Sequence, residues 1–160
     1  MQKSKSMSLV YLGLGTNLGD KEQNLNDAVM ALTLETGNVM CLSSFYTSVP
    51  WGFDSENEFL NAVVLVETAL TPFEVLAKTQ EIEKTLGRLE KTTDAYSDRV
   101  IDIDILMYDL LVIDQPRLTI PHPLLAVRDF VLVPFAEIAP TLIHPVLGKS
   151  ILELRRELIP

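Results

Sequence analysis

The order of strand-like and helix-like segments constrains the fold of this chain more than any other feature. Apolar residues recur at helical spacing in two segments, 21–35 and 71–86. Asp20 is a typical N-cap for the first helix, and Thr71 followed by proline is a typical start for the second. Strand-like runs surround both helices, at residues 8–14, 39–46, 59–67 and 99–108.

The resulting order, β-α-β-β-α-β, is typical of an α+β, ferredoxin-like fold in which helices flank an antiparallel sheet. Smaller elements are expected after it. Short strands are predicted near 111–113 and 118–120, followed by a helix over 124–138 that Pro134 should kink or break. A last short helix is expected to begin at Ser150.

Length, charge and cysteine content narrow the possible classes of protein. A chain of 160 residues suits a single domain over 1–160, with 1–6 as a disordered tail. The formal net charge of −9 argues against a nucleic-acid partner, which requires a basic face. Apolar runs are too short and too interrupted to span a membrane. The single Cys41 cannot form an internal disulfide, which fits a cytoplasmic protein, and we expect a monomer.

Glycines after the first apolar run suggest a nucleotide-binding loop, but their spacing does not support one. Gly13 and Gly15 lack the third glycine of a dinucleotide-binding turn, because Leu18 occupies that position. A P-loop motif is also absent from the sequence. We therefore interpret these glycines as part of a tight strand-to-helix turn.

Asp102 and Asp104 are the strongest local signal of function. Residues i and i+2 of a strand share one face, with Cβ atoms about 6–7 Å apart, while Ile101, Ile103 and Ile105 would be buried opposite. Neighbouring carboxylates repel each other unless a cation lies between them, and such oxygen ligands suit Mg²⁺. A solvated strand face explains the pair equally well, so spacing alone leaves both interpretations open.

Arg99 strengthens the functional interpretation, because it precedes Asp102 by three residues at a loop-to-strand junction. Arginine binds phosphate oxygens bidentately and stays charged. Arg88 and Arg128 are further candidates, and two long loops at 47–58 and 87–98 lie near them in sequence. The structural alternative is an ordinary ion pair. We favour a phosphate clamp made of arginine and metal.

Histidines and aromatic residues carry weaker signals. His122 and His144 each precede proline and so lie in extended backbone. A lone histidine is usually structural, and only His122 gains interest from the arginine that follows it. Phe59 alternates with Asn61 on one strand face, which would suit a flat heterocycle. Residue type alone still favours a core role for the aromatic side chains, which are Trp51, Phe53, Phe59 and Phe130.

Together these motifs resemble the 6-hydroxymethyl-7,8-dihydropterin pyrophosphokinase family. The resemblance covers nearly the whole chain, and its most specific part is the Arg-x-x-Asp-x-Asp segment from Arg99 with the downstream Pro-His-Pro around His122. The chain departs from the family pattern at Ser97-Asp98, Glu90 and Leu124. Two of these departures put one phosphate contact in doubt.

The resemblance implies a ferredoxin-like enzyme that transfers diphosphate from ATP to a pterin hydroxymethyl group and releases AMP. Its partners would be these two small molecules, and two Mg²⁺ ions would be bound by Asp102 and Asp104. The matching ATP-binding positions are Arg88, Arg99, His122 and Arg128 at the phosphates, and Gln80, Glu83, Arg117 and Thr119 at the nucleoside. Arg88 and Arg99 would also be catalytic. The matching pterin-binding positions are Ser48, Val49, Trp51, Phe59, Asn61 and Phe130.

Two other classes of function remain open on the residues alone. A non-catalytic small-molecule sensor on the same scaffold would show no metal-dependent affinity for a nucleotide. A hydrolase that uses the same metals would form AMP without any pterin.

Overall fold

The computed structural model describes residues 6–50, 55–87 and 99–159, and its centre is an antiparallel sheet. The main path of the sheet runs β2-β4-β1-β5, and β3 pairs with β4 beyond the end of β2. The strands are β1 (Ser8–Thr16), β2 (Asn38–Leu42), β3 (Tyr46–Ser48), β4 (Phe59–Thr68) and β5 (Asp102–Tyr108).

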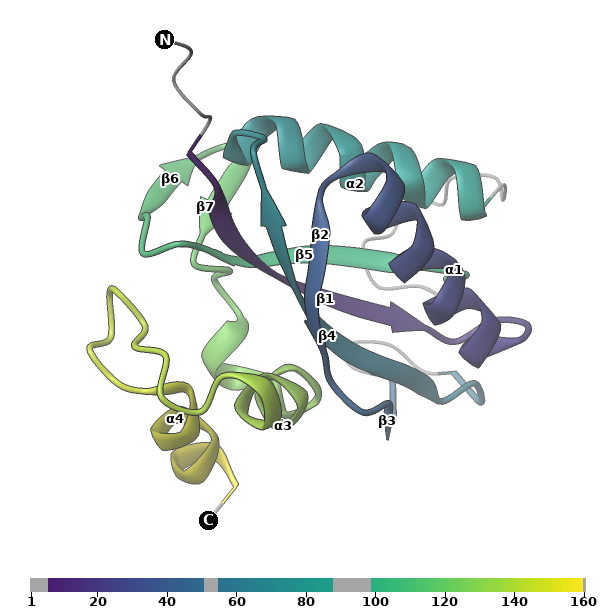
Figure 1. Ribbon diagram of the computed structural model, residues 1–160. Helices are drawn as coiled ribbons and strands as arrows, with labels where there is room; N and C mark the ends of the chain where they lie inside the picture. Colours follow the sequence, from purple (N-terminus) through teal and green to yellow (C-terminus); the bar gives the residue numbers. More distant parts are fainter. Residues whose placement is uncertain (1–5, 51–54, 88–98, 160) are drawn as a thin grey trace, which may run out of the picture.

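Helices cover both faces of this sheet (Figure 1). One face carries α1 (Lys21–Glu35) and α2 (Pro72–Gly87), and the opposite face carries α3 (Asp129–Ile138) and α4 (Ile151–Leu158). The hairpin of β6 (Ile113–Gln115) and β7 (Leu118–Ile120) lies at one side, and a 3₁₀ turn spans Leu125–Val127. This arrangement confirms the α+β, ferredoxin-like fold.

The sheet separates two hydrophobic cores. On the first face, Leu12 and Ile105 of the sheet pack with Leu25 of α1 and Ile82 of α2. On the second face, α3 packs against the sheet around the fully buried Phe135, and α4 packs against α3. Both faces of the sheet are therefore covered by helices, because alternate residues of a strand point to opposite faces and each apolar face must be buried.

The helix starts agree with the sequence signals. The Asp20 carboxylate accepts the Gln23 N–H at 3.1 Å, which caps α1. Thr71 and Glu74 exchange side-chain hydrogen bonds with each other's backbone N–H groups at the start of α2, which is a capping box. Ser150 and Glu153 form the same motif at α4.

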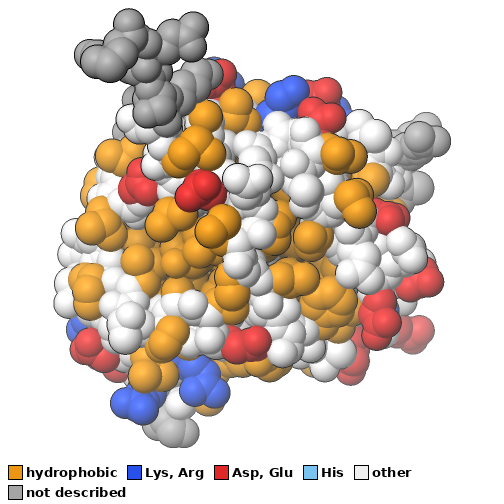
Figure 2. Space-filling model, viewed as in Figure 1, with side chains coloured by type: hydrophobic (Ala, Val, Ile, Leu, Met, Phe, Trp, Pro, Cys, Tyr) orange, Lys and Arg blue, Asp and Glu red, His pale blue; other side chains and the backbone are white. Residues whose placement is uncertain are grey.

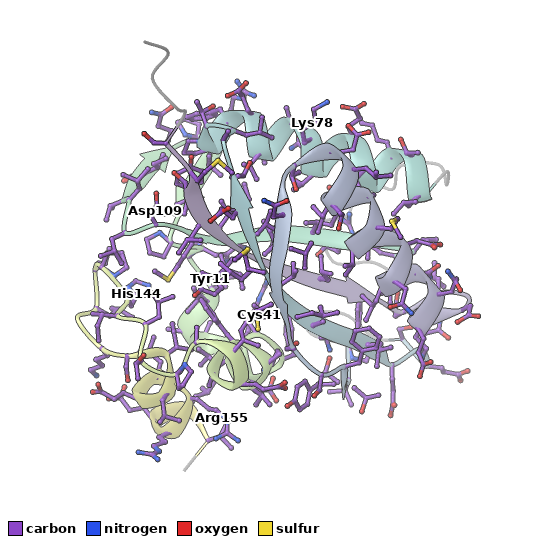
Figure 3. All side chains as sticks on the ribbon, in the orientation of Figure 1. Tyr11, Cys41, Lys78, Asp109, His144 and Arg155 are labelled. Carbon is purple, nitrogen blue, oxygen red and sulfur yellow. The ribbon has the colours of Figure 1, made fainter. Side chains whose placement is uncertain are left out.

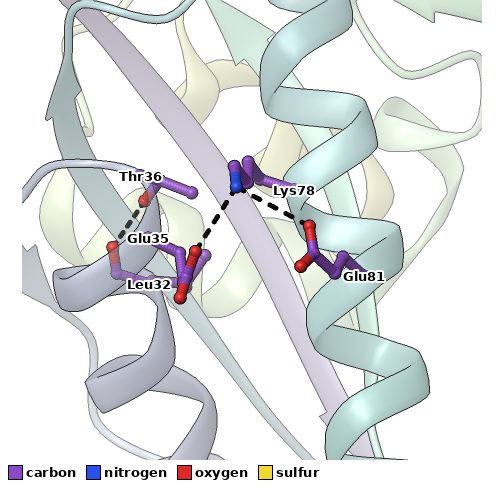
Figure 4. Close-up of polar contacts among 5 residues, drawn as sticks. All are labelled: Leu32, Glu35, Thr36, Lys78 and Glu81. Carbon is purple, nitrogen blue, oxygen red and sulfur yellow. Dashed lines mark hydrogen bonds and ion pairs between the residues drawn. The ribbon is translucent and has the colours of Figure 1, made fainter.

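The two helices on the first face are also joined at their surface (Figure 4). Lys78 of α2 lies 3.4 Å from the Glu35 carboxylate of α1 and 3.6 Å from Glu81 of its own helix. Beside them, the Thr36 hydroxyl donates to the Leu32 carbonyl at 2.7 Å and ends α1. Exposed pairs of this kind contribute about 0–1 kcal/mol, so apolar burial holds the helices in place.

The strand predicted over 39–46 is wrong in one respect, because the structure divides it into β2 and β3. Ser43 lies at the break, where its hydroxyl accepts the Val63 N–H at 2.9 Å and its own N–H donates to the Val63 carbonyl. A serine hydroxyl that replaces a backbone acceptor interrupts a regular ladder. The short strand expected near 111–113 is likewise shifted to 113–115.

The helix predicted over 124–138 is interrupted at Arg128, not at Pro134. Arg128 has extended backbone angles, with φ −113° and ψ 109°, and separates the 3₁₀ turn from α3. Pro134 is buried inside α3, where it removes one backbone donor from a helix of 10 residues. The chain changes direction at Arg128, beside the cleft described below.

Apolar side chains reach the surface at the centre of the face shown in Figure 2, where Figure 3 places Tyr11 and Cys41. His144, also in Figure 3, is buried, and its Nδ1 accepts the N–H groups of Val146 and Leu147. These bonds support the structural role expected for His144. Within the described ranges, every helix is too short or too polar to cross a bilayer.

Candidate active site

A cleft of about 360 Å³ opens on the sheet face that carries α3. Strands β1, β4 and β5 form its floor, and the segment from His122 to Val131 forms one wall. Most predicted site residues that the structure describes line it, namely Ser48, Val49, Phe59, Asn61, Arg99, Asp102, Asp104, His122, Arg128 and Phe130. Side chains from positions as far apart as Ser48 and Phe130 are thus brought together at one place.

Two glycines in the middle strand form the bottom of this cleft. Gly15 pairs with Asn61 on one side and with Asp102 on the other. Gly13, one row further, pairs with Asp104 and lines the same cleft. A Cβ atom on Gly15 would lie 3.4 Å from the Asn61 Oδ1 atom, so glycine here leaves an open trough between the amide and the carboxylates.

The turn predicted for these glycines is therefore wrong. Both belong to β1, which extends through Thr16, and the turn to α1 begins only after it. The reason is tertiary, since β4 and β5 flank β1 on both sides and continue its ladder through Gly15.

Asp102 and Asp104 share the cleft face of β5, as their spacing predicted, while Ile101, Ile103 and Ile105 are buried opposite. Burial, together with the charge of Asp102, raises the pKa of Asp104 to about 7 against the opposing effect of Arg128 and Arg99. A buried carboxyl group with such a shifted pKa in a cleft is a candidate for a functional role.

Glu83 of α2 is a third carboxyl group beside this pair. Its Oε2 accepts the Ile103 N–H at 2.9 Å, between the two aspartates in sequence. Burial, with the charges of Asp102 and Asp104, raises the pKa of Glu83 to about 8, although the bond from Ile103 acts in the opposite direction. Glu83 was expected near the nucleoside, and its contact with β5 places it next to the acidic pair as well.

The donor set fits Mg²⁺. Among the described residues, no group of three or more His, Cys, Asp or Glu side chains could hold a metal ion. Mg²⁺ is commonly bound by one or two carboxylates, water and substrate phosphates, so two aspartates facing an open cleft suffice. A cation bound between Asp102 and Asp104 would reduce the repulsion between their carboxylates.

Arg128 connects the acidic floor to the aromatic wall. Its Nη1 lies 3.7 Å from Asp104 Oδ2, and its guanidinium lies over the Phe130 ring, 5.5 Å from the ring centre. The side chain is largely buried, and a guanidinium in this environment stays charged. It therefore supplies a fixed positive charge between the two parts of the cleft.

His122 faces the same aspartate, with Nε2 4.0 Å from Asp104 Oδ2. Its Nδ1 accepts the Leu124 N–H at 3.1 Å, so the proton of the neutral ring is on Nε2. Burial and the Arg128 charge lower the pKa of His122 to about 4. At neutral pH His122 is thus an uncharged hydrogen-bond donor on the cleft wall.

Asn61 presents a defined hydrogen-bonding group to the cleft. Its Nδ2 donates to the Tyr46 carbonyl at 3.1 Å and to the Ser48 hydroxyl at 2.8 Å. A carbonyl can only accept, so these bonds determine the orientation of the amide and leave Oδ1 toward Gly15. The ring of Phe59 lies beside the same point, 3.6 Å from a Gly15 Cβ position. An acceptor next to an aromatic ring suits a flat heterocycle that carries N–H groups.

Asn17 is a site residue to which the sequence reasoning assigned no role. Its Oδ1 accepts the Arg99 N–H at 2.6 Å, and its own N–H donates to the Arg99 carbonyl at 3.0 Å. Its Nδ2 donates to the Asn57 carbonyl at 3.3 Å. Asn17 thus joins the segment before β5 to the segment before β4. The only signal in the sequence was its place in the turn after β1.

Some predicted positions lie away from the cleft or outside the described residues. Arg117 is exposed and lies over the Phe73 ring at the start of α2, 5.6 Å from the ring centre. Thr119 lies on β7, and Gln80 is exposed on α2. Trp51 and Arg88 fall outside the described residues, as do three of the departures from the family pattern, at 90, 97 and 98.

Comparisons with known proteins identify the family of this chain. The model of a family described as 7,8-dihydro-6-hydroxymethylpterin-pyrophosphokinase (HPPK) matches residues 11–140. A Porphyromonas gingivalis protein named 2-amino-4-hydroxy-6-hydroxymethyldihydropteridine pyrophosphokinase is 45% identical over 141 residues, 87% of this chain and 95% of that protein. An Aquifex aeolicus protein of the same name is 41% identical over 151 residues, 94% of this chain and 92% of that protein.

Solved structures support the fold. The HPPK-DHPS protein of Plasmodium falciparum, solved with SDX-DHP, superposes with a TM-score of 0.78 at 16% identity, covering 99% of this chain. At this identity the likeness concerns the fold alone, and this chain spans 45% of that longer one. The family match and the two relatives carry the assignment. The chain is a member of the 7,8-dihydro-6-hydroxymethylpterin-pyrophosphokinase family.

Proposed function

We propose that this protein transfers diphosphate from MgATP to the hydroxymethyl group of 6-hydroxymethyl-7,8-dihydropterin, a step of tetrahydrofolate biosynthesis. The products are the pterin diphosphate and AMP. The observation that carries the proposal is the trough over Gly13 and Gly15, which has Asn61 on one side and Asp102 and Asp104 on the other. Relatives that bear this enzyme's name match over most of the chain.

The reaction asks the protein mainly for positioning and charge neutralisation. The pterin hydroxyl oxygen forms a bond to the β-phosphorus of ATP, and the bond from that phosphorus to the oxygen it shares with the α-phosphate breaks. The hydroxyl proton is lost, and AMP leaves with the electron pair. Enzymes that transfer phosphoryl groups work chiefly by alignment and electrostatic stabilisation. Arginines and a metal site that face one trough suit such a reaction.

Asp102 and Asp104 would hold the metal, and we propose two Mg²⁺ ions. When bound, Mg²⁺ neutralises charge on the phosphate oxygens and orients the attacking and leaving oxygens. Arg99 and Arg128 would bind phosphate oxygens from the cleft wall, and His122 would donate from Nε2. Arg88, outside the described residues, is proposed as a further phosphate ligand and, with Arg99, as catalytic.

Asn61 Oδ1 would accept a hydrogen bond from the edge of the pterin ring. Phe59 and Phe130 would lie on its two faces, since both line the cleft. Ser48, Val49 and Trp51 are proposed to complete this pterin site. The proposed nucleoside site consists of Gln80, Glu83, Arg117 and Thr119.

We further propose that the protein is a single cytoplasmic domain over 1–160, acts as a monomer and has no nucleic-acid partner. Its net charge of −9 supports the last point. Its single cysteine, Cys41, is free, which suits a reducing compartment.

The direct test is an assay for AMP release from MgATP with and without the hydroxymethyl pterin. We expect AMP to appear only when both pterin and Mg²⁺ are present. Formation of AMP without pterin would instead indicate a hydrolase. A parallel titration with a non-hydrolysable ATP analogue tests for a small-molecule sensor, because a sensor would show no nucleotide affinity that depends on Mg²⁺.

A further inference from the structure

Glu137, near the C-terminal end of α3, makes a concentrated set of hydrogen bonds to the segment that enters β3. Its carboxylate oxygens accept the Ser44 N–H at 3.0 and 3.1 Å and the Ser44 hydroxyl at 3.2 Å. The same carboxylate accepts the Tyr46 hydroxyl at 2.5 Å. Hydrogen bonds to an ionised carboxylate are stronger than those between neutral groups. Such a set at the edge of the fold calls for an explanation.

The electrostatic state of the two partners agrees with this contact. The hydrogen bond from Tyr46, followed by the bonds from Ser44, lowers the pKa of Glu137, so the carboxylate is ionised at neutral pH. The same bond raises the pKa of Tyr46, whose hydroxyl therefore keeps its proton. Arg155 of α4, labelled in Figure 3, acts on Tyr46 in the opposite direction.

The segment that Glu137 contacts leads directly to the pterin side of the cleft. β3 has three residues and pairs along one edge with β4, with Tyr46 opposite Asn61 and Ser48 opposite Phe59. The Tyr46 carbonyl and the Ser48 hydroxyl accept both donor bonds of the Asn61 amide. A shift of β3 would therefore release the amide and allow Oδ1 to turn away from the cleft.

Glu137 also belongs to the helix that supplies the opposite wall. Phe130 lies in the first turn of α3 and lines the cleft, while Glu137 lies two turns later on the same helix. The contact with Ser44 and Tyr46 thus links the helix that carries Phe130 to the strand beside Phe59. This link adds to the direct packing of α3 against β4, the strand that carries Phe59.

We propose that Glu137 is a positioning residue for the pterin substrate: its carboxylate holds Ser44 and Tyr46 against α3, which orients the Asn61 amide and spaces the aromatic walls of the cleft. This inference rests on the function proposed above and extends it to a residue outside the cleft. It assigns Glu137 no contact with substrate. The acidic pair and Arg99 lie on or beside β5, and Arg128 lies at the opposite end of α3 from Glu137, so nucleotide binding should depend on Glu137 much less than pterin binding does.

The test compares Glu137→Ala with Glu157→Ala, a matched change at an exposed glutamate of α4. Calorimetry would measure the Kd of the hydroxymethyl pterin, in the presence of a non-hydrolysable ATP analogue and Mg²⁺, and the Kd of the analogue alone. We expect Glu137→Ala to raise the pterin Kd about tenfold, which corresponds to about 1.4 kcal/mol, and to leave the nucleotide Kd within about twofold.

Two further variants separate positioning from general stability. Glu137→Gln keeps one acceptor oxygen and should recover part of the pterin affinity, and Tyr46→Phe should show an intermediate loss. The inference is overturned if Glu137→Ala binds pterin as tightly as Glu157→Ala does. It is also overturned if pterin and nucleotide affinity fall together with the melting temperature, because that pattern indicates a merely structural role. A wild-type protein that transfers no diphosphate would instead refute the proposed function.

Discussion

Asn17 holds the backbone of Arg99 from both sides: its Oδ1 accepts the Arg99 N–H at 2.6 Å, and its N–H donates to the Arg99 carbonyl at 3.0 Å. Asn17 is buried, whereas Arg99 lies at the edge of the cleft just before β5. A buried side chain in the turn after β1 thus fixes the backbone position of a cationic residue that lies in a loop.

Replacement of Asn17 by alanine should therefore weaken catalysis through Arg99. We expect KM for ATP to rise and kcat to fall, so that kcat/KM decreases about tenfold, because Arg99 loses its fixed backbone position. The free energy of unfolding should decrease by about 1–3 kcal/mol, since an N–H group loses its acceptor. Steady-state kinetics and urea unfolding measure both effects. Asn26→Ala, an exposed change on α1, is the control and should alter neither.

Gly15 should be needed for the size of the pterin site and not for the strand itself. A Cβ atom here would meet Asn61 Oδ1 at 3.4 Å and the Phe59 ring at 3.6 Å, which are tolerable contacts. Gly15→Ala should therefore fold with unchanged or higher stability and bind pterin about tenfold more weakly, since the methyl group occupies the trough. Calorimetry with pterin and with nucleotide checks this. Gly87→Ala is the matched control because its Cβ would meet nothing within 4 Å.

Asp102→Ala or Asp104→Ala should reduce kcat by about 10²-fold or more while the fold survives. The reason is the loss of a metal ligand that faces the phosphates. For Asp102→Ala, the melting temperature in EDTA should not fall, because a charge that repels Asp104 is removed. Rates of AMP formation within about threefold of wild type would exclude the assignment. Asp114→Asn, at an exposed position of β6, provides the control.

The metal-free protein should lose stability as the pH rises toward 8. The pKa values of Glu83 and Asp104 are raised to about 8 and about 7, so the folded protein binds more protons than the unfolded chain above pH 4.5. His122, whose pKa is lowered to about 4, has the opposite effect only between about pH 4 and 6.5. The net decrease should therefore be clearest above pH 6.5.

Urea unfolding in EDTA at pH 6.5, 7 and 8 tests this expectation. Glu83→Gln should show a shallower decrease, because glutamine does not titrate and its oxygen can still accept the Ile103 N–H. Addition of Mg²⁺ should flatten the wild-type curve. Stability that rises over this pH range would contradict the proposed arrangement of carboxyl groups.

Phe130→Ala should weaken pterin binding more than nucleotide binding. The ring lines the cleft and also supports the Arg128 guanidinium, so the nucleotide will be affected slightly and the stacked pterin strongly, about tenfold. Calorimetry with each ligand gives the comparison. Phe130→Leu, which keeps apolar volume without a flat ring, should resemble Phe130→Ala for pterin. A larger effect on nucleotide binding than on pterin binding would indicate that Phe130 has a structural role in the core.

Much of the fold was readable from local signals. Period and caps placed α1 and α2 to within a residue, because a cap such as Asp20 and an apolar stripe are local properties of the chain. The alternation around Asp102 and Asp104 likewise indicated their shared face, since strand geometry alone dictates it. The break at Ser43 was not readable, because it depends on a bond to Val63 of another strand.

The sequence by itself determined the order of elements, the acidic pair on one strand face and, through its motifs, the family. Tertiary structure decided which residues meet across the sheet. Gly15 lies between Asn61 and Asp102 only because β4 and β5 pair with β1 on either side, and Glu137 contacts Tyr46 across 91 positions of sequence. Contacts of this kind depend on which strands pair and how helices pack across long stretches of sequence, and the pattern within one segment does not reveal its distant partner.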